Sequence, residues 1–161
     1  MNYTRWPIVV RMTAFLLAQL GAHAADRFAE RIAPLDLAPR HVGLLRWIAA
    51  HPGASQREIA AAFGVQPSRV VVLVDELERR DLVQRHQDPG DRRSRSVRLT
   101  ERGERMLAEV GRVFLAHQAD LLAALTEEES AVLGELLGKV AAARGLTDGV
   151  HPGHAAADSG A

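Results

Sequence analysis

The chain of 161 residues contains no cysteine. Disulfide bonds, thiolate zinc sites and redox sensing by a cysteine side chain are therefore excluded. Aromatic residues are scarce, at 4% of the sequence, whereas apolar residues as a group make up 47%. A core that depends on Ala, Leu and Val favours a helical fold over a β-sandwich. The length fits one domain with an attached oligomerisation element.

The chain also has no net charge, because 20 basic side chains balance 20 acidic ones. Overall neutrality argues against a polyanionic partner, but positive charge needs only to be local. Residues 85–98 contain five arginines and two aspartates. Nearly all basic residues of the chain are arginines, whose planar guanidinium groups suit bidentate contacts to phosphates and bases. Composition alone therefore does not establish a DNA partner.

No apolar run is long enough to cross a membrane. The N-terminal region has features of a signal peptide, with an apolar run over residues 12–20 and the small-residue motif Ala22-His-Ala24. However, Arg11 precedes this run and Gln19 interrupts it, and the helical pattern of apolar residues continues to Ile32. We therefore expect a cytoplasmic protein that begins with a helix and has no membrane partner.

Hydrophobic periodicity and capping signals predict six helices. Pro34 ends the first helix, and a linker over residues 35–39 follows it. The predicted helices cover about Ile8–Ile32, Arg40–Ala50, Ser55–Gly64, Pro67–Asp81, Glu101–Leu125 and Thr126–Arg144. Residues 145–161 have little to bury, so we expect a flexible tail.

The third and fourth predicted helices form a helix-turn-helix. Ser55 and Glu58 are spaced as a capping box, in which each satisfies a backbone donor at the helix start. Gly64 ends this helix, and Pro67 begins the next at a position that favours proline. Apolar residues at i, i+3, i+4 and i+7 predict the buried stripe of the fourth helix, which consists of Val70, Leu73, Val74 and Leu77.

A two-stranded hairpin is predicted after the fourth helix. Asp81 stands where a helix-terminating glycine is usual, and aspartate tolerates the left-handed conformation. Leu82-Val83 and Val97-Arg98-Leu99 read as short strands that flank a loop at Asp88-Pro-Gly90. A helix-turn-helix followed by an arginine-bearing hairpin is the arrangement that places one helix in the major groove of DNA and a wing beside it.

Polar and basic side chains of this segment are predicted to contact double-stranded DNA. Ser68 can donate to a phosphate or a base edge, and Arg69 can fork onto guanine. Val71 and Val72 also lie off the buried stripe. One interpretation is that both contact thymine methyl groups, and the alternative is that Val72 packs against the wing or a neighbouring helix. The predicted contact residues are Ser55, Gln56 and Arg57 at a helix N-terminus, Gln66, Ser68, Arg69, Val71 and Val72 on the recognition helix, and Arg92, Arg93 and Arg95 in the wing.

Asp91 is predicted to pair with one of the wing arginines and to fix the shape of the loop. The wing also carries the most specific motif of the chain, an Asp-x-Arg sequence followed by a strand that ends in Leu-Thr. This motif and others resemble those of the multiple antibiotic resistance regulator (MarR) family. The motifs are Leu44-Leu-Arg-Trp-Ile48, Ser55-Gln-Arg-Glu-Ile-Ala60, Val70 to Leu77, Asp81-Leu-Val-Gln-Arg85 and Asp91-Arg-Arg-Ser-Arg-Ser-Val-Arg-Leu-Thr100.

The similarity in helix order covers about residues 8–144. It implies a homodimeric winged-helix repressor in which Arg93 enters the minor groove and the first, fifth and sixth helices form the dimer interface. Val71 and Val72 depart from the more polar residues frequent in the family, which implies a shifted operator preference. The absence of cysteine excludes the peroxide-sensing branch of the family.

The predicted fold class is therefore mainly α, a winged helix-turn-helix with a small two-stranded β wing and an all-helical dimerisation bundle. Residues 1–34 form an N-terminal dimerisation helix, 35–100 the DNA-binding lobe, 101–144 the C-terminal dimerisation helices and 145–161 the tail. The terminal helices are more apolar than a monomer of this size requires, which favours a bundle between two chains. Two copies would read half-sites about 10 base pairs apart on a pseudo-palindromic operator.

The family resemblance also implies a small aromatic or phenolic effector that enters a cleft between bundle and lobe and releases DNA. His41, Trp47 and Phe114 are the residues predicted to line this cleft, although a lone Trp on a helix is usually a core residue and His41 can be a partly exposed one.

The sequence predicts neither a metal site nor a cofactor. No two histidines stand at i and i+4 on a predicted helix, and His151 and His154 lie in the tail. The chain has no Ser/His/Asp order, phosphate-binding glycine loop or dinucleotide fingerprint, so we expect no enzyme. The alternative function is a winged-helix protein-interaction module without DNA binding, which the neutral net charge favours and the arginine-rich wing opposes.

Overall fold

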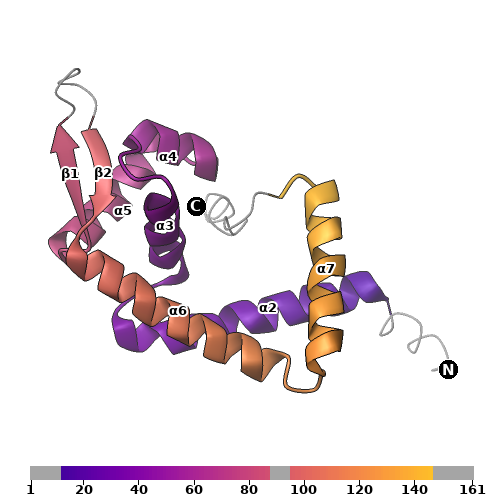
Figure 1. Ribbon diagram of the computed structural model, residues 1–161. Coiled ribbons are helices and arrows are strands. Elements are labelled where there is room, and N and C mark those ends of the chain that lie inside the picture. The colour runs from indigo at the N-terminus through magenta and orange to yellow at the C-terminus, as the bar shows by residue number, and fades with distance from the viewer. Residues whose placement is uncertain (1–11, 88–94, 147–161) are drawn as a thin grey trace, which may run out of the picture.

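The computed structural model describes residues 12–87 and 95–146 (Figure 1). Helices dominate the fold, and its two strands form one antiparallel hairpin. The elements in chain order are α2 (Thr13–Ile32), the 3-10 turn η2 (Ala33–Leu35), α3 (Pro39–Ala50), α4 (Gln56–Phe63), α5 (Pro67–Arg79), β1 (Val83–Gln87), β2 (Arg95–Leu99), α6 (Glu101–Leu121) and α7 (Glu127–Ala143). The predicted mainly α winged-helix fold class is confirmed.

A compact lobe consists of α3, α4, α5 and the hairpin, and its core lies between them (Figure 1). The side chains of Leu45 and Ile48 from α3, Ile59 from α4, and Val74 and Leu77 from α5 are almost completely buried. Because these residues recur at helical spacing, each short helix turns one apolar face into the same core. The predicted buried stripe of α5 is confirmed, except that Leu73 is only partly buried.

Local capping signals place the helix ends as predicted. The Ser55 hydroxyl accepts from Glu58 N at 3.3 Å, and Glu58 Oε2 accepts from Ser55 N at 2.7 Å, which completes the capping box of α4. Gly64 ends this helix with a φ of 62°, and Pro67 is the first residue of α5. A second capping box, between Thr126 and Glu129, begins α7.

The hairpin is longer than the predicted strands. The register pairs Val83 with Leu99 and Arg85 with Val97, so each strand has five residues. Leu82 was predicted as a strand residue, but it lies before β1, where its carbonyl accepts from Thr100 N at 3.1 Å. On its other side β2 bonds to the segment that precedes α4, where Val97 N donates to Ala54 O at 2.9 Å.

The turn between α5 and β1 depends on a left-handed aspartate. Asp81 has a φ of 56°, which confirms the prediction that it replaces a terminating glycine. Its carbonyl accepts from the Thr100 hydroxyl at 2.5 Å, so the turn is tied to the first residues of α6. In the first turn of α6, a Cβ on Gly103 would lie 1.9 Å from the Leu82 carbonyl oxygen, so only glycine permits this close approach.

Helix α6 leads from the base of the hairpin to α7, and α2 packs alongside it (Figure 1). The predicted end of α6 at Leu125 is wrong, because the helix ends at Leu121 and a tight turn over residues 122–126 reverses the chain. This turn contains no glycine or proline, so the apolar pattern runs through it without a stop signal.

The other predicted bounds differ in smaller ways. A 3-10 turn follows α2, and α3 begins at Pro39 rather than Arg40. The predicted helical residues 8–11 and the predicted tail from 147 onward lie outside the described residues. In the part of the chain that the structure describes, no helix has both the length and the apolar character needed to cross a membrane.

Candidate nucleic-acid interface

Helix α5 exposes the face that the sequence assigned to DNA. Val71 and Val72 are 39% and 55% exposed, whereas their neighbour Val70 is 1% exposed. Gln66 and Ser68 are exposed at the N-terminal end of this helix, and Arg69 is partly buried. This end therefore presents hydrogen-bonding groups and two β-branched side chains on one accessible surface.

A groove borders this surface on the side of α3. It has a volume of about 340 Å³, and its walls come from α3, α4 and α5. Val72 lies on the groove together with Leu44, Phe63 and Leu73, with Arg40, Arg69 and Glu76 as its polar members. Val72 thus lies beside a neighbouring helix, as one of the two interpretations of this residue requires, but more than half of its surface stays accessible.

The N-terminus of α4 brings together the three residues predicted to meet a phosphate. Arg57 is exposed, whereas Ser55 and Gln56 are partly buried. The Ser55 backbone N–H donates to the Glu58 carboxylate, and this hydrogen bond lowers the pKa of Glu58 below its ordinary value. Of the three residues, Arg57 is therefore the most accessible to a phosphate.

Gln56 is engaged by an arginine of the wing. In the amide orientation that satisfies both polar atoms, the Gln56 side-chain oxygen accepts from Arg85 Nε at 2.6 Å and from Nη2 at 3.2 Å. Arg85 also forms ion pairs with Asp75 and Glu78 on α5, and its side chain is only 13% exposed. Sequence reasoning counted Arg85 with the positive charge of the wing and missed this arrangement.

A signal for the inward position of Arg85 exists in the sequence. Alternate residues of a strand point to the same face, so Arg85 shares its face with Val83. Val83 is 1% exposed, and its apolar side chain identifies the inner face of β1. The acidic residues at 75 and 78 are three positions apart on α5, a spacing that puts both on one face of the helix.

The wing tip lies outside the described residues. This applies to the predicted minor-groove residues Arg92 and Arg93 and to Asp91. Arg95 is placed through its backbone, as the first residue of β2 opposite Gln87. The structure therefore places the two strands that flank the tip, and the contacts of the tip arginines remain predictions.

The three residues predicted to bind an effector face different neighbours. His41 is buried, its Nδ1 accepts from Ala38 N at 3.1 Å, and its Nε2 lies 2.7 Å from Glu76 Oε2. Because Nδ1 is an acceptor, the ring proton is on Nε2 and is donated to Glu76. Burial is the main cause that lowers the pKa of His41, and the hydrogen bond to Glu76 opposes it.

Trp47 and Phe114 lie in separate aromatic contacts. Trp47 stacks on His51 with ring centroids 4.2 Å apart. Phe114 meets the edge of Phe28 at 5.9 Å, and the guanidinium carbon of Arg46 lies 5.9 Å from its ring centroid. Phe114 is 43% exposed, so this residue of the predicted trio offers an accessible aromatic surface beside a cation.

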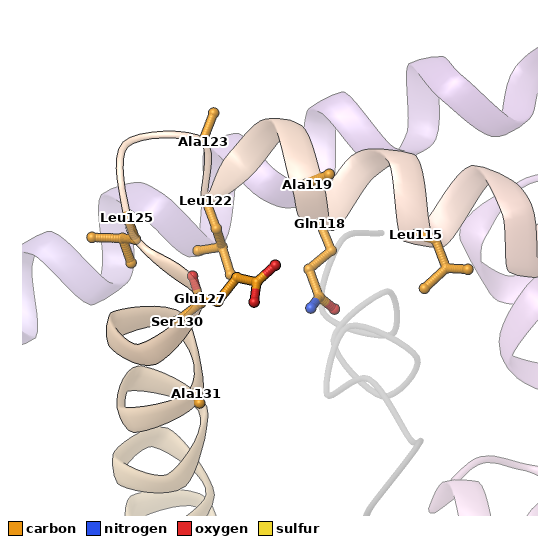
Figure 2. Close-up of a pocket in the computed structure, with 9 residues that line it drawn as sticks. All are labelled: Leu115, Gln118, Ala119, Leu122, Ala123, Leu125, Glu127, Ser130 and Ala131. Carbon is orange, nitrogen blue, oxygen red and sulfur yellow. The ribbon is translucent and has the colours of Figure 1, made fainter.

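A second cavity of about 450 Å³ lies where α6 turns into α7 (Figure 2). Figure 2 shows Leu122, Ala123 and Leu125 at the bend, with Glu127 and Ser130 on the α7 side. Leu115, Gln118 and Ala119 from α6 and Ala131 from α7 complete its wall. Neither cavity is lined by His41, Trp47 or Phe114.

Exposed apolar side chains concentrate on the long helices. Within the described residues, every exposed large apolar side chain other than Val71 and Val72 lies on α2, α6, α7 or the residues next to them. Helix α7 is described over its whole length and contains no buried residue. Over residues 12–87 and 95–146, no group of three or more histidine and acidic side chains is placed to hold a metal ion.

Comparisons with known proteins agree with this architecture. Residues 35–94 match the model of the MarR family. The transcriptional repressor CouR, solved on a 23-mer DNA duplex, is 27% identical, with a TM-score of 0.74 over 87% of this chain and 99% of CouR. A MarR family regulator from Rhodococcus sp. RHA1 is 29% identical, with a TM-score of 0.67 over 80% of this chain and 89% of the relative.

A third similar structure is a MarR family protein of Mycobacterium tuberculosis in complex with DNA. It is 26% identical, with a TM-score of 0.70 over 80% of this chain and 97% of that protein. The family match coincides with the helix-turn-helix and the first part of the wing, and the structural match extends over the long helices. The chain therefore has the winged helix-turn-helix fold of these MarR family structures, and its residues 35–94 match the model of that family.

Proposed function

We propose that this protein is a homodimeric transcriptional repressor that binds a pseudo-palindromic site in double-stranded DNA. The observation that carries the proposal is the exposed N-terminal surface of α5, with Ser68, Val71 and Val72 accessible beside an antiparallel wing. Such a helix fits the major groove, and the wing arginines reach the adjacent minor groove. Two of the similar structures were solved on DNA, which supports the same mode of binding here.

The dimer is supported by the apolar surface of the long helices. Val132, Leu136 and Val140 recur every four residues on α7 and are all more than half exposed. Met12, Leu16 and Leu20 form a similar row at the start of α2. Monomeric proteins rarely leave contiguous surfaces of this kind in water, and a second copy of the chain covers them by isologous packing.

The cavity in Figure 2 adds a concave surface between α6 and α7, next to the exposed side chains of Leu115 and Leu125. Apart from Gln118, its wall is apolar along the α6 side, and an amphipathic helix of the partner would fill it with side chains such as those of α2. With the bundle formed, the two α5 helices are held at a fixed separation, which sets half-sites about 10 base pairs apart.

A small aromatic acid is the proposed effector, and Phe114 with Arg46 is the pair that supports it. The exposed ring offers stacking and the guanidinium offers a partner for a carboxylate, at the junction of α3 and α6. His41 and Trp47 are occupied by contacts within the lobe, so we assign them no contact with the effector. Release follows if the effector favours a dimer whose α5 separation no longer matches the half-sites.

DNA binding and dimerisation are tested together on the purified protein. A duplex is first enriched by the protein from a pool of random 30-base-pair sequences, and affinity for it is then measured by fluorescence anisotropy at several salt concentrations. We expect affinity to fall steeply with salt and sedimentation to give a dimer. A protein that enriches no sequence and binds the unselected pool at no salt concentration is instead an interaction module.

A further inference from the structure

We propose that Arg85 is the positioning residue of the reading head, by which we mean α5, the wing strand β1 and the start of α4. This inference rests on the proposed DNA binding and adds a role that differs from phosphate contact. Arg85 lies in the middle of β1, opposite Val97, and its side chain turns away from solvent toward α5. There it joins the three elements whose surfaces are assigned to DNA.

The contacts of Arg85 use the whole guanidinium group. Nη2 donates to Asp75 Oδ1 at 2.5 Å, and Nη1 donates to the Glu78 carboxylate. Nε donates to the Gln56 side-chain oxygen at 2.6 Å, and Nη2 also approaches the Val71 carbonyl at 3.4 Å. A forked, planar cation suits this position, because it binds partners on α4 and α5 at once while its own backbone belongs to β1.

The backbone of Arg85 is part of the same arrangement. Its N–H points away from β2 and donates to Glu78 Oε1 at 3.1 Å. Glu78 therefore accepts from both the backbone and the side chain of one residue, which fixes the distance between α5 and β1. The anchored part of α5 follows directly after Val71 and Val72, so a shift of this anchor moves the exposed surface of the helix.

Charge balance separates Arg85 from the arginines that would hold phosphates. Two carboxylates neutralise its single positive charge, and only 13% of its side chain is exposed. A phosphate would have to displace these partners and would be repelled by the carboxylates of Asp75 and Glu78, which are 50% and 39% exposed. Arg57 is exposed and has no carboxylate partner among residues 12–87 and 95–146, so it serves as the matched control.

Conservative and non-conservative variants distinguish the two roles. Lysine keeps the positive charge but cannot fork, so a phosphate contact survives in Arg85→Lys and the positioning role does not. We expect Arg85→Lys to weaken binding to the enriched duplex by about tenfold, with little change for the unselected pool and an unchanged salt slope. Arg57→Lys should bind nearly as the parent does, whereas Arg57→Gln should reduce the salt slope by about one.

A double-mutant cycle tests the link through Gln56. If Gln56 acts through Arg85, the loss in Gln56→Ala with Arg85→Lys is smaller than the product of the two separate losses. If Gln56 contacts DNA directly, the two losses multiply. Hydrogen exchange of the α5 amides, measured without DNA, should rise in Arg85→Lys and stay unchanged in Arg57→Lys.

Several outcomes would overturn the role of Arg85. Parental affinity in Arg85→Lys, or equal losses on both DNA probes, would show that the fork does not position the reading head. Multiplicative losses in the cycle would contradict the link to Gln56. If the parent itself binds neither probe, the proposed function fails and the role of Arg85 fails with it, whereas the other outcomes leave the proposed function intact.

Discussion

The lobe and the long helices differ in how completely their buried polar groups are hydrogen-bonded and their apolar side chains are buried. In the lobe, the buried His41 has a hydrogen-bond partner at both ring nitrogens. Where α2 crosses α6, the buried His117 Nδ1 and Arg31 Nε have no partner among the described residues, although Arg31 Nη2 reaches Asp120 at 2.6 Å. Most exposed apolar side chains also belong to the long helices.

This difference supports the proposed dimer, because the lobe buries its apolar faces within one chain and the long helices leave theirs exposed. A domain that folds alone buries its apolar faces and pairs its buried polar groups. The lobe does both, whereas α7 buries no residue along its described length. Substitutions in the lobe should therefore affect folding, and those on α7 should affect association.

The largest expected effect tests the contact between the lobe and the start of α6. Gly103→Ala places a methyl group against the Leu82 carbonyl and forces α6 away from the base of the wing. We expect the free energy of unfolding to fall by about 3 kcal/mol, measured by urea denaturation. Gly111→Ala, in the same helix with open space around its Cα, should instead stabilise by about 0.5 kcal/mol. Equal effects of both substitutions would contradict the tight approach.

The next effect tests the long helices. Leu136→Asp introduces a charge in the middle of the exposed apolar row of α7. We expect the dimer dissociation constant to rise by about 100-fold in sedimentation equilibrium, because an unpaired charge in an interface costs roughly 3 kcal/mol. The far-UV circular dichroism of the protein should change little, because the lobe stays folded. Lys139→Gln, on the same helix, makes the same change of one unit in net charge and is the control, and an undisturbed dimer in Leu136→Asp would refute this interface.

A third effect concerns pH and involves both regions. Burial lowers the pKa of His41 and of His117 below the ordinary value of 6.5. Well above pH 6.5 the two histidines are neutral in both the folded and the unfolded chain. Below this pH they take up protons in the unfolded chain more readily than in the folded chain, so the free energy of unfolding falls as the pH falls. The loss approaches about 1.4 kcal/mol per pH unit for each histidine at most, until the lowered pKa is reached.

Thermal melting between pH 7.5 and 5 measures this loss. His41→Gln should flatten part of the profile, and His117→Gln should flatten the remainder. A profile that is equally steep without His41 and His117 would exclude burial of these two side chains as its cause.

The smallest effect returns to the lobe. Asp81 holds a left-handed conformation that glycine adopts without steric cost. Asp81→Gly should raise the free energy of unfolding by about 0.5 kcal/mol, because the hydrogen bond from Thr100 goes to the backbone carbonyl and is kept. Asp81→Ala should have the opposite sign. Stabilisation by alanine would mean that the conformation of this turn costs nothing.

Features that depend on nearby residues could be predicted from the sequence. The capping boxes at Ser55 and Thr126, the start of α5 at Pro67 and the left-handed Asp81 each follow from a few adjacent residues. The exposure of Val71 and Val72 followed from the period of the helix.

Features that depend on distant residues could not be predicted in the same way. The end of α6 at Leu121 has no stop residue and is set by the reversal into α7. The engagement of Gln56 by Arg85 joins residues 29 positions apart in the sequence. His41 was read as an effector contact, but its hydrogen bond to Glu76 on α5 spans 35 positions. Only the packed lobe brings such pairs together.

Helix α6 has a mechanical consequence that follows from its length and its two ends. It has 21 residues without a break, so it is about 30 Å long at 1.5 Å per residue. Its first turn is locked to the wing base by the Gly103 contact, and its last turn leads into α7. If α6 tilts by about 10° about its α7 end, its wing end moves by roughly 5 Å. This displacement is larger than the 3.4 Å rise between stacked bases. A small tilt of this rigid helix is thus enough to move the reading head into or out of register with the base pairs of the duplex.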